Sequence, residues 1–139
     1  MRTGFTLIEL LLVLAVMAVL AGFGVPAMIG MRDRISVRLA AADAARAVAD
    51  ARTVALTAAR RTAVRIDAIA NTLTVVSGPD TIRTLRLNEY GVQLRTTRDS
   101  IAFGPTGIGW GAATATITLT KGSASTALAI SRLGRIRRT

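Results

Sequence analysis

The sequence of 139 residues contains no cysteine and no histidine. Without cysteine there is no disulfide framework, and without histidine the most common general base and metal ligand are missing. The few acidic residues after the N-terminal region are scattered, and no two of them have the spacing of a metal-binding loop. We therefore expect a protein that is not an enzyme, with no metal site and no cofactor.

Negative charge is also scarce. The chain has 18 basic and 8 acidic residues, which gives a net charge of +10, and all of the basic residues except Lys121 are arginines. Arg2 and Glu9 are the only charged residues before Arg32, so the excess charge belongs entirely to the region that follows. A basic surface attracts nucleic acid, anionic lipid or acidic protein, and composition does not decide among them.

The most prominent feature is the apolar run over residues 5–31, which raises the mean hydropathy to +0.47. A bilayer core of about 30 Å is crossed by about 20 apolar residues in a helix, so this run is long enough to span a membrane. A cleaved secretory signal is the alternative, but its apolar core has about 7–15 residues. Glu9 is unusual because charged residues inside membrane helices are normally functional and paired.

Residues 32–61 are rich in alanine and lack glycine and proline, which predicts an amphipathic helix that continues the apolar one. Arg46 and Asp50 are spaced to form an ion pair on a solvated face. The apolar positions of this predicted helix recur mostly at steps of three and four residues: Ile35, Leu39, Ala42, Val48, Ala55 and Ala59.

Over residues 62–139 the apolar period changes to two, which predicts strands. Alternation is clear at 64–68, 72–75 and 115–119, and Leu128 and Ile130 suggest a last strand after a turn at 121–125. The segment GPTGIGWG lacks the Lys-Ser/Thr of a phosphate-binding loop, so a surface loop is expected. The predicted fold class is α+β, with a long N-terminal helix on a small antiparallel β domain.

The segment from Arg2 to Glu9, RTGFTLIE, resembles the class III signal of type IV pilins and type II secretion pseudopilins. The resemblance implies that a prepilin peptidase cuts after Gly4 and methylates the new N-terminus at Phe5. It implies that Glu9 pairs with the N-terminal amine of a neighbouring subunit in a filament. A proline such as Pro26 is common in this part of pilin helices, where the resemblance implies a weak point that bends or melts on assembly.

The second half is similar to the GspH/FimT family of minor pilins and pseudopilins, through residues 100–107, the strand at 117–119 and residues 130–137. The resemblance implies a pilin-like architecture. Its parts are a leader (1–4), a transmembrane and filament-core helix (5–31), an amphipathic helix (32–61) and a β domain with a basic tail (62–139). It also implies a single-pass protein of the bacterial inner membrane with its C-terminal domain in the periplasm, although arginines after the run favour the opposite orientation by the positive-inside rule.

Two functions share this architecture. The first interpretation is a GspH-like minor pseudopilin of a type II secretion system, which would join other pseudopilins in a periplasmic filament. The alternative is a FimT/FimU-like minor pilin, which primes pilus assembly or binds DNA in natural transformation. The resemblance links the DNA-binding role to a Gly-Arg-x-Arg tail, and Gly134 to Arg137 match this pattern. A membrane protein that joins no filament is a third class, in which the leader would stay uncut.

The spacing of the arginines in the basic tail bears on the DNA hypothesis. If the tail is extended, Arg135 and Arg137 lie on one face, with Arg132 and Arg138 adding charge nearby. Such a group makes a few phosphate contacts, which gives weak, salt-sensitive binding without sequence preference. The competing interpretation is a solvated chain end with no binding role.

Overall fold

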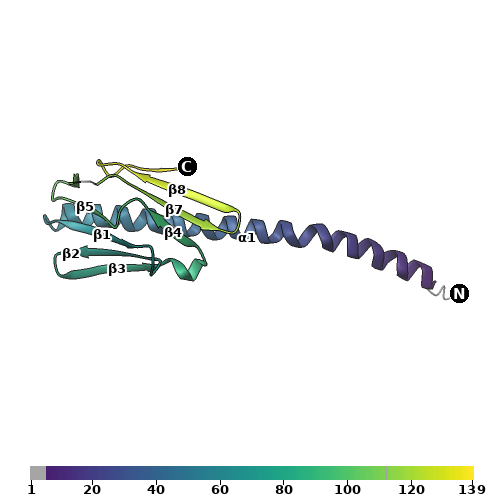
Figure 1. The fold of residues 1–139 in the computed structure, drawn as a ribbon. Helices are drawn as coiled ribbons and strands as arrows, with labels where there is room; N and C mark the ends of the chain where they lie inside the picture. The colour runs from purple at the N-terminus through teal and green to yellow at the C-terminus, as the bar shows by residue number, and fades with distance from the viewer. Residues whose placement is uncertain (1–5, 112) are drawn as a thin grey trace. The chain divides into compact units, whose positions relative to one another are not determined.

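The computed structural model describes residues 6–111 and 113–139, and the side chains of all of these except residues 23–27. Within these residues, one helix, α1 (Leu7–Thr57), is followed by nine strands and a short 3-10 helix. Figure 1 shows the course of the chain. The chain divides into two compact units, one ending at Arg32 and the other comprising Asp33–Thr139.

The first unit is the N-terminal part of α1, which is helical from Leu7 and remains so through Pro26. Its large apolar side chains from Leu7 to Leu20 are half exposed or more, with Leu7 at 77% and Leu20 at 62%. Such a large apolar surface in a single chain is typical of a segment that another surface covers. Among the described residues, no helical stretch meets the length and hydropathy needed to cross a membrane.

The second unit begins with the remainder of α1, whose buried face is made of small residues. These residues recur at three- and four-residue steps and are at most 1% exposed: Val37, Ala40, Ala41, Ala44, Ala47, Val48, Ala51 and Ala55. The predicted apolar face was wrong at Ile35 and Leu39, which are 47% and 54% exposed, and at Ala59, which is also exposed. The buried face of this part of the helix is therefore made mostly of alanines, with valine at positions 37 and 48.

The helix also ends earlier than predicted, at Thr57 rather than Arg61. Ala59 has a φ of +50°, a left-handed conformation that stops the helix, and β1 begins at Thr62. The predicted pair of Arg46 with Asp50 is also wrong. Arg46 contacts Asp43 at 3.3 Å, and Asp50 pairs at 3.0 Å with Arg83 from a distant strand.

The first sheet has five strands in the order β3-β2-β1-β5-β6, and all neighbours are antiparallel. Val64 and Ile66 of β1, and Leu73 and Val75 of β2, point inward as their period of two predicts. The sequence pattern did not reveal β3, β5 or β6. The strands are β1 (Thr62–Asp67), β2 (Thr72–Ser77), β3 (Asp80–Arg86), β5 (Ser100–Phe103) and β6 (Gly109–Trp110).

The second sheet has four antiparallel strands in the order β4-β7-β8-β9. The turn between β7 and β8 is tight, because the strands end and restart at Lys121 and Ala124. The strand through Leu128 and Ile130 is not the last one, since β9 follows and pairs with it. The bounds are β4 (Gln93–Thr96), β7 (Ala115–Lys121), β8 (Ala124–Ile130) and β9 (Ile136–Arg138), with the 3-10 helix η1 at Leu87–Tyr90.

Both sheets and the helix share one hydrophobic core. In Figure 1, β2 and β3 run along one side of this part of α1, and β7 and β8 run along the other. Phe103, Leu73 and Ile117 are fully buried at 0% exposure. All described members of the core lie between Val37 and Ile130, so Asp33–Thr139 contains a complete core of its own. The fold is therefore the predicted one: a long N-terminal helix with antiparallel β-sheets.

Candidate functional site: the helix start and the basic C-terminal strand

Glu9 takes part in a reciprocal capping arrangement at the start of α1. The backbone N–H and the hydroxyl of Thr6 both donate to Oε2 of Glu9 at 2.9 Å, and the N–H of Glu9 donates to the Thr6 hydroxyl at 3.3 Å. This is a capping box, in which Ser or Thr before the helix and Glu three residues later satisfy each other's backbone donors. The Thr-x-x-Glu spacing of Thr6 and Glu9 is the signal in the sequence that predicts this cap.

The capping box means that the Glu9 carboxylate has hydrogen-bond partners within its own chain. Glu9 is exposed, so this carboxylate is also accessible to a partner from outside. The predicted processing residues Gly4 and Phe5 lie outside the described residues. Pro26 is part of the helical backbone, and its side chain lies outside the described ones.

The basic C-terminal region is an ordered edge strand. A turn precedes it, in which the Gly134 N–H donates to Ser131 O at 2.8 Å and the Ser131 N–H donates to Arg135 O at 2.9 Å. Gly134 has a φ of +73°, and an added Cβ would lie 2.9 Å from Cδ of Arg52, so both conformation and space favour glycine. β9 then pairs with β8, and Thr139 exchanges backbone hydrogen bonds with Ala127.

The strand separates the tail arginines between two faces. Ile136 is half-buried and packs against the core, which fixes the register of the strand. Arg137 lies opposite the exposed Ala129, and Arg138 lies opposite the buried Leu128, so the two point to opposite sides. Arg137 and Arg138 are nevertheless both exposed, because β9 is an edge strand.

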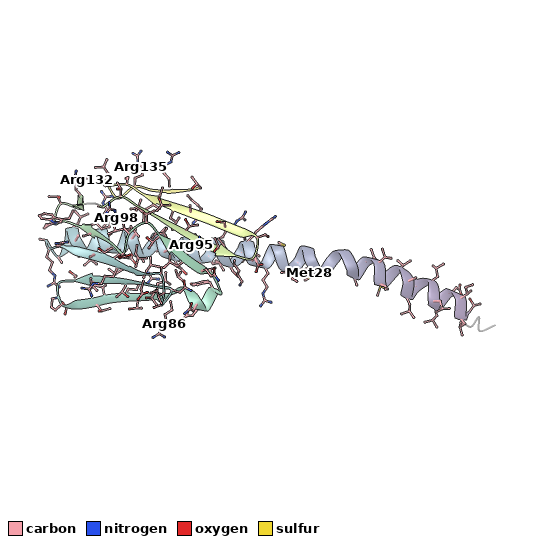
Figure 2. The ribbon with its side chains drawn as sticks, viewed as in Figure 1. Met28, Arg86, Arg95, Arg98, Arg132 and Arg135 are labelled. Carbon is pink, nitrogen blue, oxygen red and sulfur yellow. The ribbon has the colours of Figure 1, made fainter. Side chains whose placement is uncertain are left out.

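Arg132 and Arg135 lie on either side of the turn and are also exposed. Figure 2 shows both at the same end of the second sheet, with Arg135 pointing away from the ribbon. In the part of the chain that the structure describes, none of the four tail arginines forms an ion pair. The backbone that carries these four arginines is held by hydrogen bonds and is not a loose chain end.

Trp110 lies close to this basic region, although the two are far apart in the sequence. The N–H of its neighbour Gly109 donates to Arg132 O at 2.7 Å. The guanidinium of Arg61 lies 5.9 Å from the centre of the Trp110 ring, within cation–π range. The Trp110 side chain is 58% exposed, so the ring remains available to a partner. From the sequence alone, Trp110 was equally compatible with an anchor for a partner and with a cover of the hydrophobic core.

A polar cluster around Lys121, near the start of the second unit, was not predicted from the sequence. Lys121 Nζ donates to Ser36 Oγ at 3.0 Å and to Tyr90 O at 2.9 Å, so it joins β7, α1 and η1. The Tyr90 hydroxyl donates to the Asp43 carboxylate, and this hydrogen bond raises the pKa of Tyr90. These bonds hold the helix, the 3-10 turn and the hairpin together at one end of the domain.

Known proteins resemble this chain in its N-terminal segment and in its fold. Residues 1–25 match the family model of the prokaryotic N-terminal methylation motif. None of the curated protein sequences compared with the chain matches it. A solved structure of the type IV minor pilin FimU of Pseudomonas aeruginosa is 19% identical, covers 75% of this chain and 88% of that one, and has a TM-score of 0.63. A second crystal form of FimU is 16% identical, with 73% and 91% covered and a TM-score of 0.60.

The minor pseudopilin EpsH of the type II secretion system of Vibrio cholerae has the same fold. It is 15% identical, with 75% of this chain and 96% of that one covered, at a TM-score of 0.60. The second unit therefore has a pilin-like fold, which minor pilins and minor pseudopilins share. The chain combines this fold with a prepilin-type N-terminal methylation motif, and the fold does not separate the two classes.

Proposed function

We propose that this chain is a minor subunit of a pilin-type filament. The observation that carries the proposal is the combination of a methylation motif over residues 1–25 with an exposed apolar helix and a pilin-like domain. In such a subunit, prepilin peptidase cuts after Gly4 and methylates Phe5. The helix up to residue 31 anchors the chain in the inner membrane, and the second unit lies in the periplasm.

Glu9 has two partners in this proposal. In the single chain its carboxylate accepts hydrogen bonds from Thr6, as the capping box describes. In the filament it pairs with the N-terminal amine of a neighbouring subunit. A carboxylate in an apolar surrounding is costly without a compensating charge, so the pair disfavours arrangements in which the amine is absent. The capping box stabilises the carboxylate before that partner arrives.

Between the two classes, we propose a GspH-like minor pseudopilin of a type II secretion system. The likeness to EpsH, which covers 96% of that chain, agrees with this interpretation but does not separate it from the alternative, because FimU has the same fold. The alternative, a FimU- or FimT-like minor pilin, is favoured by the likeness to FimU and by the exposed arginines of the C-terminal strand.

A deletion in the source bacterium distinguishes these classes. For a pseudopilin, deletion abolishes secretion of the folded extracellular proteins and leaves pili and transformation intact. For a minor pilin, deletion reduces piliation or DNA uptake and leaves secretion intact. Complementation with the intact gene is the internal control. A Glu9→Leu variant, which cannot form the amine pair, is tested beside it. If the deletion changes none of these properties, the filament proposal is wrong.

The DNA hypothesis requires a separate binding experiment on the Asp33–Thr139 unit. The test variant is Arg135→Ala/Arg137→Ala. The matched control is Arg86→Ala/Arg95→Ala, because both of these arginines are exposed and neither belongs to the ion pairs found among the described residues. Figure 2 shows Arg86 on the side of the domain away from Arg135. Arg60 and Arg61 are unsuitable, since Arg60 pairs with Asp80 and Arg61 contacts Trp110.

The binding is measured as a function of salt. Each phosphate contact contributes about 0.9 to the slope of log K against log salt, so removing two contacts lowers the slope by about 1.8. If the tail variant alone shows this loss, the DNA-uptake interpretation is favoured over secretion. Equal losses in both variants, or negligible binding at physiological salt, mean that the tail contributes only general charge.

A further inference from the structure

A cavity of about 290 Å³ lies between the first turns of α1 in the second unit and the β7–β8 hairpin. The helix contributes Arg34 and Arg38, which are four residues apart and therefore on one face. The hairpin contributes hydroxyl groups and a small apolar floor. The lining residues are Arg34, Val37, Arg38, Ser123, Ala124, Ser125 and Thr126.

The chemistry of this lining is that of an anion site. Two arginines line the cavity, and a guanidinium offers forked donors that match phosphate oxygens. The other lining residues include the polar Ser123, Ser125 and Thr126. None of the lining residues is acidic. In the described part of the chain, the arginines that form ion pairs are Arg46, Arg60 and Arg83, so neither guanidinium of the cavity is neutralised by a carboxylate. The cavity thus has donors in excess and no internal acceptor charge.

The hairpin side of the cavity is held rigidly. Gly122 has a φ of +52° at the first position of the tight turn, where glycine is favoured. The side chain of Asp33 packs against Gly122, where an added Cβ would lie 2.6 Å from Oδ2. Lys121 fastens the end of β7 to Ser36 and to Tyr90 O. Because the turn is held on both sides, Ser123 and Ser125 keep their places in the lining that Arg34 and Arg38 share.

We propose that this cavity binds the phosphate group of an anionic phospholipid of the membrane in which the chain is anchored. The proposal rests on the proposed inner-membrane anchoring, since Arg34 follows closely the end of the apolar run at residue 31. Ile35 and Leu39 alternate with the two arginines and are 47% and 54% exposed. Apolar side chains next to basic ones, immediately after a membrane segment, are typical of a surface that meets lipid headgroups.

The proposed consequence is an electrostatic preference for anionic lipid at the start of the domain. A guanidinium near an anionic lipid surface changes the binding constant by about fivefold. Replacing both arginines should therefore weaken binding of an anionic headgroup by more than about tenfold. Free inorganic phosphate offers the same oxygens without the apolar chains, so it should bind at the same place but more weakly.

The test uses the full chain in dodecyl maltoside micelles, with backbone amide shifts of residues 122–126 followed by NMR. The titrants are dihexanoyl phosphatidylglycerol, dihexanoyl phosphatidylcholine and inorganic phosphate. The variants are Arg34→Gln/Arg38→Gln and, as a second probe of the cavity, Ser123→Ala/Ser125→Ala. The matched control is Arg86→Gln/Arg95→Gln, and thermal unfolding of each variant verifies that the domain remains folded.

We expect phosphatidylglycerol to shift these amides, and phosphatidylcholine, whose phosphate is offset by its own choline cation, to shift them much less. The arginine variant should bind phosphatidylglycerol more than about tenfold more weakly, while the control does not change. Equal effects of the two lipids, equal losses in both arginine variants, or inorganic phosphate binding as tightly as the lipid would each overturn the proposal. The micelle experiment needs neither leader processing nor a filament. Extraction of the chain from membranes by alkaline carbonate would instead indicate that the anchoring itself is wrong.

Discussion

Replacing Lys121 by methionine is the sharpest test of how the domain is held together. The amine of Lys121 donates to Ser36 Oγ at 3.0 Å and to Tyr90 O at 2.9 Å, and the residue is only partly exposed. Methionine keeps most of the apolar stem and removes both hydrogen bonds. A hydrogen bond to a charged group contributes about 1.5–3 kcal/mol, but partial exposure allows water to replace part of it.

We therefore expect Lys121→Met to lower the free energy of unfolding of the Asp33–Thr139 unit by about 2 kcal/mol. For a domain of this size that corresponds to a fall in Tm of roughly 8 °C. The assay is urea unfolding followed by circular dichroism and by Trp110 fluorescence, extrapolated linearly to water. Arg137→Met is the matched control, since Arg137 is exposed on the edge strand and should change stability by less than about 0.5 kcal/mol.

A double-mutant cycle with Ser36→Ala assigns the loss to the specific contact. If Lys121 acts through Ser36, the two substitutions should show a coupling of about 1 kcal/mol. A loss below about 0.5 kcal/mol for Lys121→Met, or additive effects in the cycle, would refute the view that this lysine joins the helix to the hairpin.

Three further changes test other contacts. The hydrogen bond to Asp43 raises the pKa of Tyr90, so the stability that it contributes is complete below about pH 10 and is lost as the pH rises through the folded pKa. Tyr90→Phe should therefore flatten the fall in the free energy of unfolding above about pH 10, and an unchanged slope would contradict this. Ala44→Leu places a large side chain at a position with 0% exposure and should cost about 1–3 kcal/mol in urea unfolding, whereas Ala129→Leu on an exposed face should not. Gly134→Ala meets both a φ of +73° and Cδ of Arg52, and should lower the Tm, an effect that vanishes if the turn is not as described.

Local patterns predicted much of the fold correctly. The change of period after the helix predicted that Val64, Ile66, Leu73 and Val75 point inward, and all four are buried. The run of small and polar residues after β7 predicted the hairpin turn. These predictions worked because a strand with one buried face must alternate, and a tight turn needs glycine at a particular position.

The errors came from contacts between distant segments. The helix buries its alanines and exposes Ile35 and Leu39, which reverses the usual expectation for large apolar side chains. The sequence pattern assigned Asp50 to Arg46, whereas the fold supplies Arg83 from β3. An edge strand such as β9 has few buried residues, so its short pattern of Ile136 between arginines carries too little alternation to reveal it.

Among the candidate functional residues too, local signals were predicted from the sequence and contacts between distant segments were not. The methylation motif is a local signal, and the match over residues 1–25 follows from it directly. The arginine cavity at Arg34 and Arg38 and the proximity of Trp110 to Arg132 depend on which strands are neighbours. Spacing along the chain contains no information about such neighbours, so these sites emerged only from the fold.

The central claim is that the chain is processed as a filament subunit, and the mass of its N-terminus tests this most directly. The full chain is expressed with and without an active prepilin peptidase, and the N-terminal peptide is measured by mass spectrometry. For a filament subunit we expect cleavage after Gly4 and a methyl group on Phe5 only when the peptidase is active. An N-terminus that is identical in both strains, with residues 1–4 retained, would contradict it.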